Sequence, residues 1–320
     1  MDKIEEVLTR GVEEVLPDKT GLAGLMQKKK IRVYLGIDPT GTKLHLGHSI
    51  PLRKLQQFAD LGHEAILLMG TGTVLAGDPS QRDSARPKIT MKEIDENIKT
   101  WKGQTEKIIN FSKVTIKQNG DWLLKLSLAK MLEIASHISA FQLIKRDMFQ
   151  KRNERGDTVW AHEILYPLLQ GYDSVAMDVD AEIGGTDQTF NMLIGRELQK
   201  KMNNREKYVL TVPMILGTNG RPMSKTSNNC IWLDDSANDM FAKVMSIPDE
   251  QIESYFMLLT NVTEENIDVS DPLAAKKKLA FEIVKNFHSE GDAKNAQDNF
   301  ENTVQKGITP QDIPEHDYKG

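Results

Sequence analysis

Two short segments of the chain carry residue types that suit phosphate chemistry. The first, His45-Leu46-Gly47-His48, lies where a predicted strand turns into a predicted helix, and the second, Met223-Ser224-Lys225-Thr226, lies far downstream. A helix amino terminus presents free N–H groups and a positive dipole to phosphate, imidazoles donate hydrogen bonds, and glycine lets the backbone approach closely. A loop lysine can bring a cation to the same phosphates. Together the two segments indicate chemistry on a nucleotide such as ATP.

Two histidines three residues apart could instead hold a metal ion. Zinc sites in proteins need at least three protein ligands, and the sequence offers no third ligand to accompany His45 and His48. The single cysteine, Cys230, excludes an internal disulfide and a thiolate zinc cluster, and we interpret it as a small core residue. We therefore expect no protein-bound structural metal.

The elements that must position these segments follow from hydrophobic patterns. Residues 32–37 and 65–69 are predicted to be buried strands, and residues 47–61 a helix with His48 in its first turn. A strand, helix and strand of this length imply parallel pairing with a right-handed crossover. Further predicted elements are helices at 2–16, 91–110 and 187–202, a mostly helical stretch at 123–172, and strands at 113–117, 174–179 and 208–212. The predicted fold class is α/β, a doubly wound parallel sheet with a helical insertion near 123–165.

The pattern changes after residue 217, where helices are predicted near 236–246, 249–260 and 271–304. We therefore expect a doubly wound domain at 1–228, a small α-helical domain at 229–307 and a linker at 308–320. Within the first domain, residues 70–90 are rich in Gly, Asp, Ser and Pro and are too long for a simple connection. We interpret them as a functional loop.

Composition restricts the class of protein. The chain has 320 residues, of which 39% are hydrophobic and 27% charged, as in ordinary globular proteins. A net charge of -5 argues against a protein that coats nucleic acid without regard to sequence, since such proteins are normally basic. The first residues are polar and acidic, and no apolar run is long enough to span a membrane. We expect a cytoplasmic protein.

Several sequence blocks occur in an order and at intervals typical of one enzyme family. The blocks are Tyr34-Leu-Gly-Ile-Asp38-Pro-Thr40 followed by His45-Leu-Gly-His48, Gly77-Asp78-Pro79-Ser80, Tyr166-Pro-Leu-Leu-Gln170-Gly-Tyr-Asp173, Gly184-Gly-Thr-Asp187-Gln188 and Met223-Ser-Lys225-Thr226. In this respect residues 30–245 resemble the bacterial tyrosyl-tRNA synthetases of class I. The resemblance implies a Rossmann-like catalytic domain and assigns the following helices to an anticodon-region domain.

The resemblance implies that tyrosine is activated with ATP to tyrosyl-adenylate and pyrophosphate, and that the tyrosyl group then passes to the 3′-terminal adenosine of tRNA(Tyr). In-line attack on the α-phosphate needs stabilisation of charge rather than a side-chain nucleophile, with Mg²⁺ accompanying ATP and pyrophosphate. The implied catalytic residues are His45, His48, Lys225 and Thr226. The implied ATP-binding residues are Gly36, Asp38, Thr40, Gly47, Asp187, Met223, Ser224 and Lys225, and Arg82 and Arg86 are candidate phosphate ligands from the 70–90 loop.

The same resemblance supplies a binding site for the amino acid. It implies that the ammonium group is bound by Asp78, Tyr166 and Gln170, and that Gln188 approaches the carboxylate. Asp173 and Tyr34 would bind the phenolic hydroxyl. That pair argues against the nearest alternative, a tryptophanyl-tRNA synthetase, because an indole offers only an N–H donor.

The sequence departs from the family pattern at several places, among them Thr71-Gly72-Thr73 and Thr189, and two departures bear most on function. Pro222 stands where the family loop usually has its first lysine, preceded here by Arg221, whose planar head and shifted origin differ from those of lysine. The family also normally continues into a small RNA-binding module of the ribosomal S4 type, whereas residues 308–320 resemble a linker leading to it. We expect a truncated form in preference to a natural short form, with adenylate formation intact and tRNA charging weak.

The sequence leaves three alternative functions open, and the resemblance also implies an assembly state. A non-catalytic RNA-binding paralogue would form no adenylate, and a generic adenylyltransferase would have no use for the Tyr166 to Asp173 cluster. A tryptophanyl-tRNA synthetase would respond to a different amino acid in pyrophosphate exchange. By resemblance we expect a homodimer, with the helical insertion at 123–165 as its interface, and no membrane partner.

Overall fold

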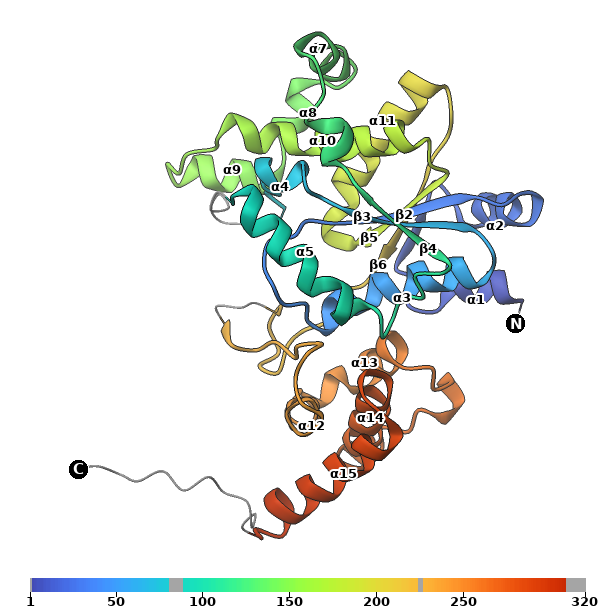
Figure 1. Ribbon diagram of the computed structural model, residues 1–320, viewed down its shortest axis with the longest axis vertical. Helices are drawn as coiled ribbons and strands as arrows, with labels where there is room; N and C mark the ends of the chain where they lie inside the picture. Colours follow the sequence, from blue (N-terminus) through green and yellow to red (C-terminus); the bar gives the residue numbers. More distant parts are fainter. Residues whose placement is uncertain (1, 81–88, 224–226, 309–320) are drawn as a thin grey trace. The chain divides into compact units, whose positions relative to one another are not determined.

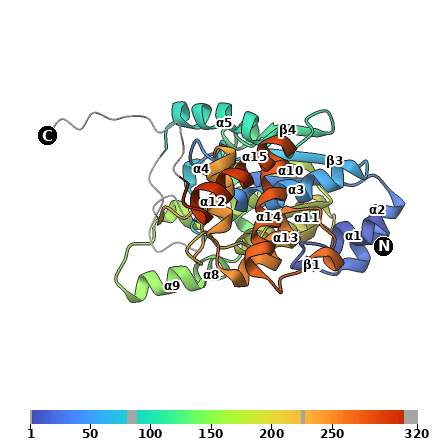
Figure 2. The same ribbon diagram turned by 90° about the horizontal axis from the view of Figure 1, so that it is seen from below.

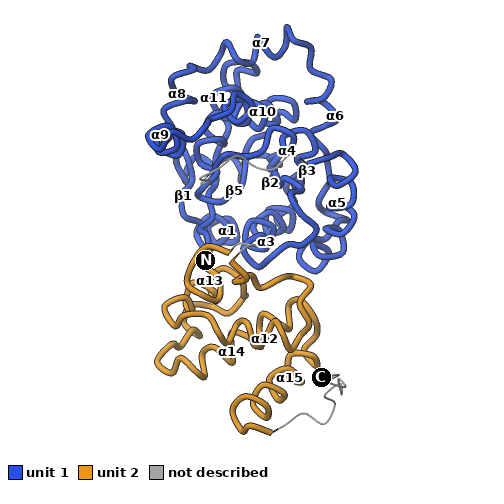
Figure 3. The backbone as a smooth tube through the Cα atoms, turned by 90° about the vertical axis from the view of Figure 1, so that its left-hand side faces the viewer, with its two compact units in different colours: residues 1–214 blue, residues 215–320 orange. Residues whose placement is uncertain are grey.

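The computed structural model describes residues 2–80, 89–223 and 227–308 and divides into two compact units, residues 1–214 and 215–320 (Figures 1 and 3). Arg82, Arg86, Ser224, Lys225 and Thr226 lie outside the described residues, as do 309–320 of the predicted linker.

The boundary between the units falls earlier than the predicted one after residue 228. The Tyr255 hydroxyl donates to the carbonyl of Leu216 at 2.5 Å, and Thr218 N–H donates to the carbonyl of Asn229 at 3.2 Å. These bonds attach the segment that begins at Ile215 to the helical unit, because both partners lie within that unit. The helical unit therefore includes the start of the Met223 loop.

Unit 1 is built on a sheet with the strand order β1-β6-β5-β2-β3-β4. Its strands are β1 (Glu14–Leu16), β2 (Arg32–Ile37), β3 (Glu64–Met69), β4 (Val114–Gln118), β5 (Ala181–Gly185) and β6 (Tyr208–Val212). All neighbouring pairs are parallel except β1 with β6. The order reverses between β2 and β5, which confirms the doubly wound α/β prediction. In such sheets ligands bind at the carboxyl ends of the strands beside this reversal.

Helices cover both faces of this sheet (Figure 1). Helices α10 (Ala161–Met177) and α11 (Thr189–Asn203) lie on one face, while α1 (Lys3–Thr9) and α3 (Leu46–Asp60) lie on the other. The remaining helices of the unit are α2 (Lys19–Lys28), α4 (Thr73–Ala76), α5 (Met91–Thr105), α6 (Gly120–Leu123), α7 (Leu128–Ser136), α8 (Ala140–Ile144), α9 (Asp147–Glu154) and the short turn η1 (Thr186–Gln188). Ile134, Ile138 and Leu143 of the predicted insertion are buried in one cluster with residues of α10 and α11.

Three predicted elements differ from the structure. The predicted helix at 2–16 ends at Thr9 and is followed by β1, which pairs with β6. The predicted strand at 174–179 is the end of α10, which stops where Asp178 takes the left-handed conformation. Ser174 and Met177 continue the buried face of that helix, so tertiary burial overrides the strand preference of Val175. Val179 lies beyond the end of the helix. The predicted helix at 271–304 is interrupted because Ser289 accepts a hydrogen bond from Asp292 N–H and caps a new helix.

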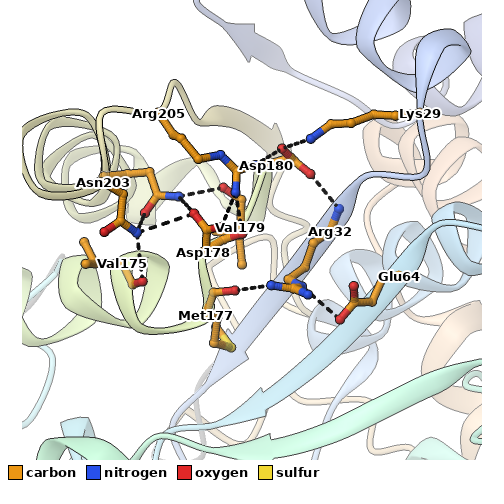
Figure 4. Close-up of polar contacts among 11 residues, drawn as sticks. Lys29, Arg32, Glu64, Val175, Met177, Asp178, Val179, Asp180, Asn203 and Arg205 are labelled. Carbon is orange, nitrogen blue, oxygen red and sulfur yellow. Dashed lines mark hydrogen bonds and ion pairs between the residues drawn. The ribbon is translucent and has the colours of Figure 1, made fainter.

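An ionic network ties the amino ends of β2 and β5 to the ends of α10 and α11 (Figure 4). Asp180 accepts from Lys29 Nζ at 2.7 Å and from Arg32 N–H at 2.9 Å, and it pairs with Arg205. The Arg32 guanidinium donates to the carbonyl of Met177 at 2.7 Å and pairs with Glu64. This network lies at the edge of the sheet opposite the carboxyl ends, so it stabilises the fold and leaves the ligand-binding edge to other residues.

A buried lysine joins α3 to the end of α1. Lys54 is 3% exposed, and its amine donates to the carbonyls of Val7 at 2.7 Å and Arg10 at 2.8 Å. Burial lowers the pKa of Lys54 from 10.5 to about 7. A neutral amine still has two N–H groups for the two carbonyls, so the contacts survive the loss of charge.

We predict a pH-dependent contribution of Lys54 to stability. Between pH 7 and pH 10.5 the unfolded state binds more protons at this lysine than the folded state, so the free energy of unfolding rises with pH. The advantage of the wild type over Lys54→Met should therefore increase, by at most about 1.4 kcal/mol per pH unit. Urea unfolding of both proteins across this range measures it. A difference that does not change with pH would show that Lys54 stays charged in the fold.

Unit 2 is helical, as predicted. Its helices are α12 (Ala237–Met245), α13 (Ile252–Leu259), α14 (Pro272–Phe287) and α15 (Glu290–Phe300), with the short turns η3 (Asp249–Gln251), η4 (Glu264–Asn266) and η5 (Glu301–Gln305). Helices α12, α14 and α15 pack against one another (Figures 1 and 2) around buried Phe241, Leu279 and Ile283. Within the described part of the whole chain, no helix has the length and apolar character needed to cross a membrane.

Candidate active site

Polar residues that follow neighbouring strands meet at the carboxyl edge of the unit 1 sheet. Asp38 follows β2, Thr73 follows β3 and Asn119 follows β4. Thr73 donates to Asp38 Oδ1 at 2.7 Å, and Asn119 Nδ2 donates to Thr73 Oγ1 at 2.9 Å. Side chains from three loops are therefore held together where a doubly wound sheet binds its ligand.

The two histidines form the amino-terminal cap of α3. His45 is the N-cap residue, and its Nδ1 accepts from Gly47 N–H at 3.2 Å. His48 Nδ1 accepts from His45 N–H at 3.2 Å, and the two ring centroids are 3.9 Å apart. Because each Nδ1 is an acceptor, the neutral rings carry their protons on Nε2. The histidines can thus present two N–H donors beside the positive end of a helix, which is the arrangement an anion requires.

Gly47 is required for this packing. A Cβ at this position would lie 3.0 Å from two atoms of the His45 ring, which is closer than ordinary carbon contacts allow. A side chain would therefore displace His45 from the cap. The predicted role of Gly47 beside the phosphates agrees with this local constraint.

The other predicted nucleotide residues lie around the reversal of strand order. Gly36 is exposed in the central strand β2, and Thr40 is exposed in the loop that follows. Asp187 follows β5 and accepts from Gln188 Nε2 at 2.9 Å. Gly36 and Asp187 thus come from the two strands on either side of the reversal, the position expected for a nucleotide. Met223 lies in unit 2 and is the last described residue before the gap at 224–226.

The residues predicted to bind the amino group have separate partners. Gln188 Nε2 donates to Asp78 Oδ2 at 2.8 Å, and the Tyr166 hydroxyl donates to Asp38 Oδ2 at 3.0 Å. Gln170 Nε2 donates to Glu182 at 3.1 Å. Asp38 is a predicted ligand of the nucleotide, and Tyr166 is a predicted ligand of the amino group. Their hydrogen bond therefore connects the two predicted binding sites.

The residues predicted for the phenolic hydroxyl lie at neighbouring positions in the interior. Asp173, 2% exposed, accepts from Asn119 Nδ2 at 3.0 Å and from Trp122 Nε1 at 2.8 Å. Tyr34 is fully buried, and its hydroxyl is 3.0 Å from Ser174 Oγ. Burial raises the pKa of Asp173 well above its ordinary value, although the two N–H donors act in the opposite direction. A carboxylate has acceptor sites beyond those two, so Asp173 can accept a further hydrogen bond from a hydroxyl group.

Sequence reasoning missed several of these partners. Asn119 directly follows a strand, a position that could have identified it. Trp122 gave no such signal, because its bond to Asp173 depends on where α6 lies relative to α10. Asn191 Nδ2 donates to Gln188 Oε1 at 3.1 Å, which orients the Gln188 amide toward Asp78. Arg146 donates to Ser80 Oγ at 3.1 Å from the helical insertion.

Asn229 holds the described base of the Met223 loop. Its side chain is buried, and Nδ2 donates to Asn219 Oδ1 at 2.7 Å and to the carbonyls of Arg221 and Pro222, each at 3.1 Å. One amide therefore fixes the chain on both sides of Pro222. Pro222 lacks an N–H, but its carbonyl takes part in this anchor.

We predict that Asn229→Ala lowers kcat for tyrosine-dependent pyrophosphate exchange about tenfold, because misplacing a predicted catalytic group by about 1 Å has effects of this size or larger. The KM for tyrosine should stay unchanged, since none of the predicted tyrosine ligands lies in this loop. Steady-state exchange kinetics measure both. The control is Asn228→Gly at the exposed neighbour, whose φ of +48° glycine tolerates. A wild-type kcat for a stably folded Asn229→Ala variant would contradict the prediction.

Comparisons with known proteins show the family to which the chain belongs. The family model described as tRNA synthetases class I (W and Y) matches residues 26–305. Tyrosine–tRNA ligase 2 of Vibrio cholerae serotype O1 is 40% identical, with all of this chain and 84% of that protein covered. The tyrosine–tRNA ligase of Francisella tularensis is 41% identical over 96% of this chain and 80% of its own length. The chain belongs to the bacterial-type tyrosyl-tRNA synthetases.

Solved structures of other tyrosyl-tRNA synthetases have the same fold as this chain. A C-terminally truncated mitochondrial tyrosyl-tRNA synthetase of Aspergillus nidulans superposes with a TM-score of 0.78 at 24% identity, covering 93% of this chain and 92% of that one. The Archaeoglobus fulgidus tyrosyl-tRNA synthetase, solved with L-tyrosine, gives a TM-score of 0.72 at 20% identity over 93% and 100% of the chains. These structures show the fold, whereas the family match and the curated relatives at 40% and 41% identity confirm the prediction of an ATP-dependent aminoacyl-tRNA ligase for tyrosine.

Proposed function

We propose that the chain activates L-tyrosine with ATP at the carboxyl edge of the unit 1 sheet and transfers the tyrosyl group to tRNA(Tyr). The observation that carries this proposal is the buried Asp173 carboxylate, held by Asn119 and Trp122 beside the Tyr34 and Ser174 hydroxyl pair. A buried acceptor of this kind selects a substrate that brings a hydroxyl donor. Tyrosine meets this requirement at the far end of its ring, whereas phenylalanine does not.

The amino end of tyrosine would lie nearer the strand ends. Asp78, Tyr166 and Gln170 supply acceptors for an ammonium group, and Gln188 supplies amide groups near the carboxylate. Gln170 Oε1 supports this role, because it is buried and has no hydrogen-bond partner within the described residues. An ammonium donor would satisfy it, which removes the cost of an unpaired buried acceptor.

The ATP phosphates would lie against the start of α3. The Nε2 protons of His45 and His48 stabilise charge as pyrophosphate leaves, with Lys225 and Thr226 contributing from the Met223 loop and Arg82 and Arg86 as additional ligands. Gly36, Thr40 and Asp187 bind the remainder of the nucleotide. Mg²⁺ is proposed to accompany ATP and pyrophosphate as part of the substrate. Among the described residues no group of three or more His, Cys, Asp or Glu is arranged to hold a metal ion.

The functional unit would be a homodimer formed through the helical insertion. Leu128 and Phe141 are 76% and 74% exposed, and Leu132 of the same helix as Leu128 is 62% exposed. Helices α7 and α8 therefore leave large apolar side chains uncovered, which is typical of a protein interface. Unit 2 is proposed as the anticodon-region domain, and the substrates ATP and tRNA accord with the predicted cytoplasmic location.

The dimer is tested by light scattering after gel filtration. The wild type should have twice the mass of one chain, and the double variant Leu132→Asp with Phe141→Asp should be monomeric. Leu273→Asp is the matched control, because Leu273 is 50% exposed on a helix of unit 2. A wild type with the mass of one chain, or a dimer that persists in the double variant, would refute this interface.

The catalytic proposal is tested by pyrophosphate exchange with each of the amino acids in turn. Tyrosine should support exchange, and tryptophan should not. Exchange with tryptophan in place of tyrosine would support the alternative specificity. A folded protein with no exchange for any amino acid would support the non-catalytic paralogue.

A further inference from the structure

An ion pair lies in the interior directly behind the proposed tyrosine site. Lys207 precedes β6 and Glu182 lies in β5, and their side chains are 0% and 2% exposed. The Lys207 ammonium and the Glu182 carboxylate are in direct contact. Replacing such a pair with apolar residues of similar size often leaves stability unchanged or improved, so stability alone gives no reason for its presence.

The pair contacts residues at both ends of the proposed site. Lys207 Nζ donates to Ser174 Oγ at 2.9 Å, and Ser174 Oγ lies 3.0 Å from the Tyr34 hydroxyl. Glu182 accepts from Gln170 Nε2 at 3.1 Å. The phenol and the ammonium group lie at opposite ends of tyrosine. The residues proposed to bind these two groups are therefore connected by hydrogen bonds to the same buried ion pair.

The lysine imposes a direction on these hydrogen bonds. An ammonium has donors only, so the Ser174 hydroxyl must accept from Lys207 and cannot donate to it. Of its described partners, only the Tyr34 oxygen can then take the Ser174 proton. Tyr34 directs its own proton to the Glu182 carboxylate, with which it also shares a hydrogen bond. Both members of the ion pair therefore fix the Tyr34 hydroxyl, Lys207 through Ser174 and Glu182 directly.

The glutamate orients the amide of Gln170 in the same way. A carboxylate has acceptors only, so it selects the NH₂ group of Gln170 and turns the amide oxygen away. That oxygen is the buried acceptor without a partner among the described residues. An acceptor held in this orientation suits the ammonium group of an amino acid.

Space for the lysine is provided by a glycine of α11. A Cβ at Gly195 would lie 2.6 Å from Lys207 Nζ and 2.9 Å from Ser174 Oγ. Any larger residue would therefore expel the ammonium from its position. Glycine has a low helix propensity, so α11 loses some helix stability at Gly195 to leave room for the buried ammonium group.

We propose that Lys207 and Glu182 are positioning residues for tyrosine, orienting Tyr34 through Ser174 and orienting Gln170 directly. The inference rests on the proposed tyrosine site and extends it to a pair that makes no contact with substrate. Loss of the pair should weaken tyrosine binding and reduce discrimination against phenylalanine, while ATP binding stays unchanged.

The test compares Lys207→Met, Glu182→Gln and the double variant Lys207→Met with Glu182→Leu in pyrophosphate exchange. We expect the KM for tyrosine to rise at least tenfold, the ratio of kcat/KM for tyrosine over phenylalanine to fall at least tenfold, and the KM for ATP to stay constant. The double variant leaves no unpaired buried charge, so it should remain folded if a single variant does not. Lys54→Met is the matched control, a buried lysine outside the site, and should change thermal stability without changing selectivity.

The outcomes separate the two proposals. A folded double variant with wild-type tyrosine KM and wild-type selectivity overturns the positioning role and leaves the proposed function intact. A wild type without tyrosine-dependent exchange overturns both. Active-site titration measures the fraction of enzyme that is active. If the variants lower only this fraction, and KM and selectivity stay unchanged, the pair has a structural role and the inference is overturned.

Discussion

The Asp173→Ala variant is expected to lose most of its preference for tyrosine over phenylalanine. Tyrosyl-tRNA synthetase is itself the standard example of such selectivity, about 10⁵-fold against phenylalanine, and we take this magnitude from the family rather than from this structure. The selectivity depends on buried polar groups that stay unpaired when the substrate lacks a hydroxyl. Asp173 is the buried acceptor in the set, so its removal abolishes the penalty that phenylalanine suffers.

The surroundings of Asp173 act on the protonation of its carboxyl group in opposite directions. Burial raises its pKa, whereas the hydrogen bonds from Asn119 and Trp122 favour the charged form. Asp173→Asn is the informative companion, because it keeps the size of the side chain and one acceptor oxygen. It should retain more selectivity than alanine and less than the wild type. Exchange kinetics with both amino acids measure the ratio, and unchanged selectivity in the alanine variant would refute the assignment.

Replacement of His45 with alanine or asparagine is expected to slow tyrosine-dependent exchange by about 10² to 10³-fold, the usual effect of removing one preorganised donor to developing charge. The two variants separate chemistry from folding. Asparagine is among the best N-cap residues, so it can accept from the first turn of α3 as His45 Nδ1 does. The asparagine side chain has no N–H donor at the position that Nε2 of His45 occupies.

We therefore expect His45→Asn to melt near the wild-type temperature and yet lose the rate, whereas alanine should lose both the cap and the rate. Loss of a cap costs about 1 kcal/mol. Thermal denaturation and single-turnover adenylate formation measure the two effects. A His45→Asn variant with a wild-type rate would show that the cap, and not the Nε2 proton, is what the reaction requires.

Local sequence patterns predicted the elements nearest the chemistry well. The strand at 32–37 and the strand at 208–212 coincide with β2 and β6, and the helix predicted at 47–61 differs from α3 by one residue at each end. Each has a simple hydrophobic pattern and clear start or stop residues nearby. The end of α10 from Ser174 was predicted as a strand, because Val175 and the nearby Val179 favour a strand when the packing of α10 against α11 is not known.

The sequence by itself determined the fold class and the family, and it predicted which residues would do the chemistry. The histidine motif, the strand and helix alternation and the order of the family blocks are all local or linear properties. The tertiary structure alone decided how those residues are held. Asn119 and Trp122 on Asp173, and Lys207 and Glu182 behind Tyr34 and Gln170, come from separate elements.

In the sequence, Glu182 and Lys207 are ordinary polar residues beside two apolar strands. Their burial and pairing arise only when β5 and β6 lie side by side beneath α10 and α11. A charge in such an interior requires partners that neighbouring residues in the sequence do not supply.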